Sequence, residues 1–433
     1  MNLEKYKHIS NQSLWTYTGT VTKVVGMAVE SKGPRVNIGT LCTIIGQNQE
    51  ELLAEVVGFN GDNILLMPLG DLNGIGPGCL VESRGEQLSV SISEDLLGQV
   101  VDWQACPLDH TKLSIGESRP IENGAPNPLT RTRIQEQMVL GVKAIDGMLS
   151  VGKGQRMGIF AGSGVGKSTL MGMIARNALS DINVIALIGE RGREVREFIE
   201  KDLQEEGLKR SIVVVATSDQ PALVRLKAAK TATAIAEYFR DQGQDVLLLM
   251  DSLTRFAMAQ REIGLSIGEP PVSRGYTPSV FGALPKLLER AGYSDCGSIT
   301  GLYTVLVDGD DFNEPVTDTA RGILDGHILL SRKLAYKGHY PAIDVLGSIS
   351  RVMGDITSKE HRKLATLLKK HLAIYTEAED LINVGAYREG SNPEIDEAIS
   401  KIGAIRSFLT QATHDQFSLD ETLQMMQKII GNV

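Results

Sequence analysis

The residues best suited to chemistry are the eight from Ala161 to Ser168, which read AGSGVGKS. They follow an apolar run that ends at Phe160 and precede a helical pattern that starts at Thr169. A glycine-rich turn between a strand and a helix presents backbone N–H groups, and the positive end of the helix dipole, to a phosphate group. The segment therefore matches the Walker A loop, with alanine in place of its first glycine.

This loop predicts that the chain binds ATP together with Mg²⁺. We expect Lys167 to reach the β- and γ-phosphates and the Ser168 hydroxyl to ligate the metal. The predicted nucleotide contacts in the loop and at the helix start are Gly162, Ser163, Gly164, Val165, Gly166, Lys167, Ser168 and Thr169. Asp251 follows the apolar run 246–250 and is predicted to hold Mg²⁺ through water. Because buried strands often end in aspartate, the role of Asp251 depends on the presence of the loop.

A second group of charged residues follows the apolar run 184–188, in the sequence GERGRE from Gly189 to Glu194. In a parallel sheet, the carboxyl ends of the strands meet at the same edge, so Glu190 should lie near the phosphate loop. There it can accept a hydrogen bond from an attacking water, and Arg191 can meet the charge of the γ-phosphate. Taken by itself, the motif fits an exposed charged turn at a helix start equally well.

The surrounding pattern predicts the elements that position these groups. Residues 131–355 alternate short runs that are apolar on both faces with longer helical patterns, which indicates a parallel sheet covered by helices on both sides. Residues 17–92 carry short strands separated by glycine-rich turns, as in a small β-barrel or sandwich. We therefore predict an α/β fold with three domains: a β-barrel over 1–92, a RecA-like P-loop NTPase core over 93–355 and a small α-helical domain over 356–433.

The helical domain shows three start signals. Thr357 and Glu360 have the spacing of a capping box, followed by a stripe of leucines. Pro393 after Asn392 is typical of the first turn of a second helix. Ser418 and Glu421 begin a third helix.

Composition narrows the possible functions. The 433 residues are 42% hydrophobic and 22% charged, with a net charge of −9, and the pI is about 5.4. Nucleic-acid-binding proteins usually carry clustered lysine and arginine, and the sequence shows no such cluster, so we expect no nucleic-acid partner. The four cysteines lack metal-site spacing and indicate free thiols in a reducing compartment. The first residues lack a secretory signal, so we expect a cytoplasmic protein.

Read in order, these motifs resemble those of the rotary ATPase catalytic subunits and the type III protein-export ATPases. The likeness is strongest over residues 93–355 and within the export branch, where it is closest to the flagellar export ATPases. The family likeness rests, besides the loop, on residues 189–191, 237–241, 251–256 and 350–352, and the likeness to the export branch on residues 268–271, 274–281, 309–315 and 324–328. Virulence-type secretion ATPases share most of these residues and are the main alternative.

The resemblance implies roles for five residues. Glu190 would be the catalytic base, Arg191 a γ-phosphate contact and Glu194 a carboxylate on the water shell of Mg²⁺. Tyr340 resembles the aromatic residue that stacks on adenine, although a tyrosine before a proline is by itself more often a packing residue. Arg351 resembles the arginine finger that a neighbouring subunit donates.

An arginine finger used in trans requires a head-to-tail neighbour, and such contacts can close into rings. The resemblance therefore predicts a homo-oligomer, most simply a hexamer, at the inner face of the cell membrane. It also implies stator and stalk proteins, an export gate at the membrane and chaperone–cargo complexes as partners.

Two further hypotheses belong to other classes. A Rho-like RNA translocase would share the core, but residues 17–92 contain only two aromatic residues, Tyr17 and Phe59, for stacking on bases. A non-hydrolysing nucleotide-binding subunit would lack a carboxylate at the position of Glu190.

Overall fold

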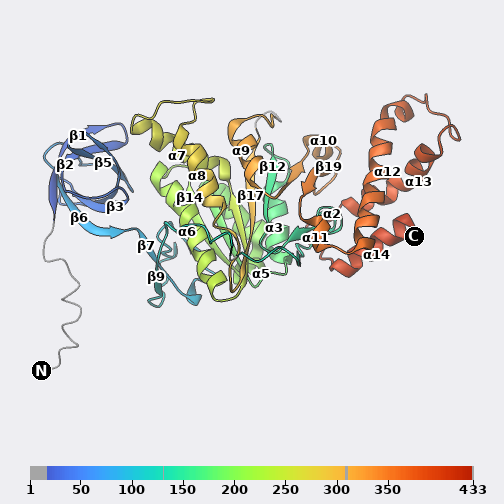
Figure 1. Ribbon diagram of the computed structural model, residues 1–433, viewed down its shortest axis with the longest axis horizontal. Helices are drawn as coiled ribbons and strands as arrows, with labels where there is room; N and C mark the ends of the chain where they lie inside the picture. The colour runs from blue at the N-terminus through green and yellow to red at the C-terminus, as the bar shows by residue number, and fades with distance from the viewer. Residues whose placement is uncertain (1–16, 130, 308–310, 432–433) are drawn as a thin grey trace, which may run out of the picture.

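The computed structural model describes residues 17–129, 131–307 and 311–431. Figure 1 shows three parts in a row: a β-barrel, a central sheet flanked by helices, and a helical unit at the C-terminal end. This arrangement confirms the predicted fold class. The boundaries predicted after residues 92 and 355 stay predictions, and residues 1–16 of the first domain lie outside the described residues.

The barrel closes in the strand order β1-β2-β5-β4-β3-β6. Inward-facing residues such as Val29, Ile44 and Val56 are fully buried in its interior. Its strands are β1 (Thr18–Val25), β2 (Ala28–Lys32), β3 (Thr40–Ile45), β4 (Glu51–Asn60), β5 (Asn63–Pro68) and β6 (Leu80–Gln87). A connecting segment follows, with the paired strands β7 (Ser89–Ile92) and β9 (Glu117–Pro120) and the short helix η2 (Glu94–Leu96).

A buried ion-pair network joins the barrel to the central domain. Lys227 is only 2% exposed, and its Nζ lies 2.5 Å from Glu55 of the barrel and 3.0 Å from Glu122 of the connecting segment. Removing one partner of such a pair leaves a buried charge without compensation, at a cost of about 3–5 kcal/mol. The network therefore fixes the barrel on the core at a place that lines no part of the phosphate cavity described below.

The central sheet has nine strands, eight of them in the order β19-β18-β12-β17-β15-β13-β14-β8, with β16 paired to β17. The pairs from β18 to β8 are parallel, whereas β19 runs antiparallel to β18. The strands are β8 (Val100–Val101), β12 (Arg156–Ala161), β13 (Ile182–Glu190), β14 (Ser211–Thr217), β15 (Asp245–Asp251), β16 (Gly292–Tyr293), β17 (Ser298–Leu306), β18 (Gly326–Leu330) and β19 (Ile343–Ser350). A separate pair consists of β10 (Gln137–Met138) and β11 (Val151–Gly152).

Helices cover both faces of this sheet, as the apolar runs predicted. On β13, Val184 and Ala186 belong to the core that includes residues of α6, α7 and α8, whereas Ile185 and Leu187 belong to the core on the other face. The helices of the central domain are α2 (Lys143–Met148), α3 (Lys167–Asn177), α4 (Gly192–Glu197), η3 (Phe198–Leu203), α5 (Gln204–Lys209), α6 (Ala222–Asp241), α7 (Leu253–Ser266), α8 (Pro278–Leu288), α9 (Pro315–Ile323), α10 (Arg332–Tyr336) and α11 (Met353–Ile356).

The C-terminal unit contains α12 (Lys359–Asn383), α13 (Pro393–Leu409) and α14 (Leu419–Ile430), which pack against α2. The predicted starts of α13 and α14 are confirmed, with Asn392 and Ser418 as N-caps. The predicted capping box at Thr357 is wrong, because Ser358 caps α12 by accepting from the His361 N–H. Among the described residues, no helix is both long and apolar enough to cross a bilayer.

Candidate functional site

The glycine-rich loop lies between β12 and α3, where the sequence predicted it. Gly164 and Gly166 have φ values of 77° and 87°, in the left-handed region that glycine adopts without strain. The loop borders a cavity of about 450 Å³, whose walls include Gly162, Ser163, Gly164, Gly166, Lys167, Ser168 and Thr169. Val165 does not line this cavity; its side chain is buried in the core, so only its backbone is available to a phosphate.

Beside this cavity, Lys167 at the start of α3 meets two carboxylates from the ends of neighbouring strands. The Lys167 Nζ lies 2.5 Å from Oδ1 of Asp251, at the end of β15, and 3.8 Å from Oε1 of Glu190, at the end of β13. The Thr304 hydroxyl of β17 also donates to Asp251, at 2.8 Å. Asp251 is 4% exposed, and these two donors compensate its buried charge.

Glu190 is the carboxyl group whose ionisation the site changes most clearly. Burial and the nearby charge of Asp251 raise the pKa of Glu190 to about 7, against the opposing effect of Lys167. The hydrogen bond from Glu190 lowers the pKa of its neighbour Glu194. A carboxylate with a pKa near neutrality can accept a proton during turnover, as a general base requires.

The predicted Mg²⁺ ligands meet in one place. Ser168, Asp251 and Glu194 line a small space of about 20 Å³ beside the phosphate cavity, together with the predicted base Glu190, and hydroxyl and carboxylate oxygens suit Mg²⁺. Within the described residues, no cluster of three histidine, cysteine, aspartate or glutamate side chains could hold a metal alone. The residues present fit an ion that takes its remaining ligands from phosphate and water.

Arg191 lies at the rim of the phosphate cavity and lines it. Its side chain is 80% exposed, and its Nη1 lies 3.6 Å from Oε1 of Glu194. Such an exposed pair contributes little to stability, so the guanidinium can move to a phosphate at small cost.

Tyr340 borders a second cavity of about 340 Å³ next to the loop. A Cβ built on Gly166 would lie 3.5 Å from the Tyr340 ring. The other walls come from α3 (Thr169, Leu170 and Met173), from Pro341 next to Tyr340, and from the segment that follows α13 (Gln411, Ala412 and Thr413). This largely neutral space is hereafter called the base pocket.

The structure does not bring Arg351 to these cavities. Arg351 follows β19, whose last residue Ser350 pairs with Gly326 at the start of β18. The backbone N–H of Arg351 donates to the Asp325 carbonyl. The phosphate loop instead follows the end of β12, which is parallel to β18. The edge with the phosphate loop and the edge with Arg351 are therefore separated by the length of β12, which has six residues at about 3.3 Å each. Arg351 therefore lies near the sheet edge opposite its own phosphate loop and is exposed.

Sequence reasoning missed Arg255, which lines the phosphate cavity from the first turn of α7. Its Nε is buried and has no hydrogen-bond partner among the described residues. The available signal was its position, four residues after Asp251. The contribution of residues 411–413 to the base pocket was missed as well, because they are distant in sequence from the loop.

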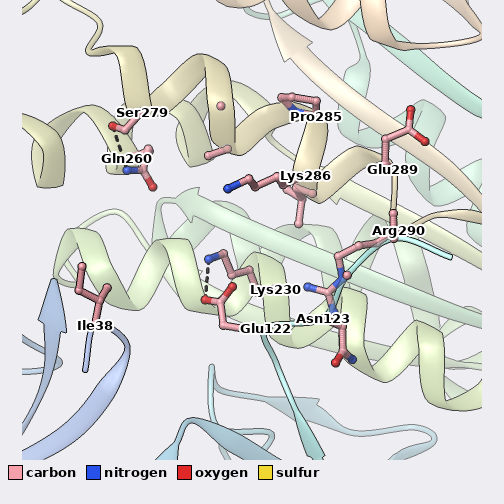
Figure 2. A pocket seen from close by; sticks show the side chains of 15 residues that line it. Ile38, Glu122, Asn123, Lys230, Gln260, Ser279, Pro285, Lys286, Glu289 and Arg290 are labelled. Carbon is pink, nitrogen blue, oxygen red and sulfur yellow. Dashed lines mark hydrogen bonds and ion pairs between the residues drawn. The ribbon is translucent and has the colours of Figure 1, made fainter. Parts of the chain in front are cut away.

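A larger cavity, of about 870 Å³, lies between the barrel, α6 and α8 (Figure 2). None of the predicted site residues lines it. Two of its cations are already paired, Lys230 with Glu122 and Arg290 with Glu237. It also lacks a glycine-rich loop, so the phosphate cavity is the better candidate for a triphosphate.

Three parts of the chain match models of known protein families. Residues 21–85 match the β-barrel domain of the ATP synthase alpha/beta family, and residues 141–350 match its nucleotide-binding domain. Residues 357–428 match the C-terminal domain of the T3SS EscN ATPase family.

Among curated proteins, the chain is 59% identical to the flagellum-specific ATP synthase of Bacillus subtilis, over 96% of this chain and 95% of that protein. It is 51% identical to the type 3 secretion system ATPase of Xanthomonas euvesicatoria, over 95% and 93%. Among solved structures, the assembled ATPase EscN of enteropathogenic E. coli superposes with a TM-score of 0.90 at 45% identity, over 95% of this chain and 100% of that chain.

Proposed function

This chain belongs to the ATP synthase alpha/beta family, among its flagellar and type III secretion ATPases, and from that premise we propose how its site hydrolyses ATP and what the hydrolysis drives. The protein is an ATPase that binds ATP.

The phosphate cavity supplies the parts that hydrolysis requires. The loop N–H groups and Lys167 hold the β- and γ-phosphates, and Arg191 and Arg255 approach the γ-phosphate from the rim and from α7. Glu190 accepts the proton of the attacking water. Ser168 would hold Mg²⁺, with Asp251 and Glu194 on its water shell, and the ion would supply positive charge against the phosphate oxygens.

The single observation that carries this mechanism is the position of Glu190. Its carboxyl lies in the phosphate cavity, 3.8 Å from the Lys167 Nζ, and has a pKa raised to about 7. A group that will take a proton from water is most effective when its pKa is close to the working pH.

The substitution Glu190→Gln tests the assignment, because it keeps the shape of the side chain and removes the base. We expect the variant to bind ATP like the wild type and to lower kcat about 10³-fold. Phosphate release and fluorescent-nucleotide binding measure the two quantities. Glu200→Gln on η3, an exposed glutamate paired only with Arg196, is the matched control and should keep full activity. Normal turnover by Glu190→Gln would refute the role of Glu190.

Arg351 completes the site in trans. Because it lies at the sheet edge opposite its own loop, it can serve only the site of a neighbouring copy. The active form is accordingly a homo-oligomer, most simply a hexameric ring, in which each interface holds one loop and one Arg351. The similar ATPase EscN has been solved as an assembled ATPase, which supports this proposal.

The work driven by hydrolysis is the export of flagellar proteins through a type III secretion apparatus. The identity of 59% to a flagellar relative, against 51% to a virulence-type one, favours the flagellar system. A second EscN structure contains the central stalk EscO, which supports a stalk partner for this chain. Stator proteins, chaperone–cargo complexes and an export gate follow from the same role, at the inner face of the cell membrane.

Deletion of the gene in its own host tests the export role. Loss of motility and of filament proteins from the medium is expected, with recovery by the wild-type gene and not by the Glu190→Gln version. Loss of virulence-type effectors with normal motility would transfer the protein to the other secretion system.

A further inference from the structure

The base pocket has two walls that belong to different parts of the chain. One wall is α3 and the Tyr340 loop, and the other is the segment between α13 and α14, which contributes Gln411, Ala412 and Thr413. Gln411 is 7% exposed, whereas Ala412 and Thr413 are exposed. The position of the second wall therefore depends on what holds Gln411.

Gln411 connects three segments by hydrogen bonds. Its Oε1 accepts from the Lys143 N–H at 3.0 Å, and its Nε2 donates to the carbonyls of Gly141 at 2.9 Å and Asp415 at 3.1 Å. Its backbone N–H donates to the Tyr340 carbonyl at 3.0 Å. Both amide donors of the side chain are thus used, and so is its oxygen.

No other residue type reproduces this set of bonds. A methionine of equal length would leave the Lys143 N–H and the Gly141 carbonyl buried without partners. A glutamate could still accept from Lys143, but its second oxygen would face two carbonyl oxygens. A side-chain amide at position 411 is therefore required to join residues 141–143 to the segment after α13.

Further contacts bind the same segment to the phosphate-loop helix. Near the end of α3, the Arg176 guanidinium donates to the Thr413 carbonyl at 2.6 Å, and the Asn177 amide donates to the Asp415 carbonyl at 3.3 Å. These two bonds lie at the surface, whereas those of the Gln411 side chain to Gly141 and Lys143 are buried. Buried hydrogen bonds are the more costly to lose, because water cannot replace them.

We propose that Gln411 is a positioning residue for nucleotide binding, through which the docking of the C-terminal helical unit sets the affinity of the base pocket. It touches no reacting atom; it holds Ala412 and Thr413 opposite Tyr340. The inference rests on the proposed function, since it takes the pocket beside Tyr340 as the place of the adenine ring. By linkage, a bound nucleotide strengthens the docking of the C-terminal unit as much as that docking strengthens nucleotide binding.

The test uses Gln411→Met and Gln411→Glu in the full-length protein. Both variants are expected to raise KM for ATP about tenfold with kcat changed less than about twofold, because the lost bonds act on binding and not on the transition state. The rise in melting temperature caused by ATP and Mg²⁺ should shrink in the same variants. Gln411→Glu keeps the shape of the side chain, so it serves if the methionine variant folds poorly.

His361→Met is the matched control. His361 is 3% exposed, and its ring Nε2–H donates to the Gly147 carbonyl at 2.8 Å, so it also joins the C-terminal unit to α2, but it lines no part of the base pocket. The control should lower the melting temperature and leave KM unchanged. Equal KM values for wild type and both Gln411 variants, or an equal rise in the His361 control, would overturn the inference. A wild-type protein that does not bind ATP would instead refute the proposed function.

Discussion

The phosphate cavity and the base pocket share Gly166 and Thr169 as walls but differ in what surrounds those residues. The phosphate cavity lies within the central domain and is lined by Lys167, whose Nζ pairs with the carboxylates of Glu190 and Asp251. The base pocket joins the central domain to the C-terminal unit and is lined mainly by Leu170, Met173, Tyr340 and other uncharged groups.

The difference indicates a division of tasks within one site. Charges that are buried and fixed in place can stabilise a transition state, because they need not reorganise as the reaction proceeds. Apolar and hydrogen-bonded walls that would contact a bound base in the same way before and during the reaction contribute to binding alone. Changes at the phosphate end should therefore alter kcat, and changes at the base end should alter KM.

The largest effect is expected from Arg351→Ala, which removes the proposed trans contribution to the phosphate end. We expect kcat to fall about 10³-fold or more, as for other arginine fingers, while the affinity for ATP changes little. Phosphate release over a range of protein concentrations measures this effect. Arg388→Ala, an exposed arginine between α12 and α13, is the control and should behave like the wild type.

Mixing variants shows whether the arginine acts in trans. Lys167→Ala lacks a functional loop and Arg351→Ala lacks the finger, so each should be inactive alone. A mixture of the two contains interfaces with Lys167 from one copy and Arg351 from its neighbour, and part of the activity should return. An active Arg351→Ala protein would mean that one chain holds the complete phosphate end.

A smaller effect is expected from pH, again at the phosphate end. Because the pKa of Glu190 is raised to about 7, kcat/KM should fall about tenfold for each pH unit below that value, as the base becomes protonated. Glu190→Gln should lose this dependence. A pH–rate profile of both proteins decides the matter, and an unchanged wild-type rate down to about pH 5 would contradict the assignment.

The raised pKa of Glu190 also makes the free energy of unfolding depend on pH. The folded-state pKa of about 7 lies above the usual value of 4.5, so the folded protein binds this proton more tightly than the unfolded chain does. This tighter proton binding stabilises the folded protein fully below pH 4.5, and the stabilisation is lost as the pH rises through 7. As the pH is raised, the melting temperature of the wild type should therefore fall relative to that of Glu190→Gln, which lacks this carboxyl group.

The smallest effect is expected at the base end. Tyr340→Leu removes an aromatic face and should raise KM for ATP about three- to tenfold, since an aromatic stacking contact contributes about 0.5–1.5 kcal/mol. Tyr340→Phe keeps the ring and should leave KM near the wild-type value. A large loss of kcat in Tyr340→Leu would show that the two ends are not separate in their tasks.

Local sequence was sufficient to predict the phosphate end in outline. The loop from Ala161 to Ser168 needs only glycines, a preceding strand and a following helix, all of which are visible in sequence. Asp251 and Glu190 could be placed beside it because strands of a parallel sheet end at one edge. Arg255 was not predicted, because an arginine in a helix has no sequence signal that shows whether its side chain lines the cavity.

The start of α12 shows the limit of local patterns. Thr357 and Glu360 have capping-box spacing, yet Ser358 is the N-cap, and the Thr357 hydroxyl donates instead to the Met353 carbonyl at 2.5 Å. Two adjacent hydroxyl residues can both cap a helix, and the packing of α11 decides between them.

By itself, the sequence determined the three-part architecture, the phosphate loop and the residue types that could perform hydrolysis, because these depend on periodicity and on neighbours along the chain. Only the tertiary structure decided that Gln411 reaches Gly141 across 270 positions, that burial raises the pKa of Glu190, and that Arg351 lies at the far edge of its own sheet. Distances between remote segments and the exclusion of water arise only when the chain has packed, and they set both the charge of a group and which copy of the chain it can serve.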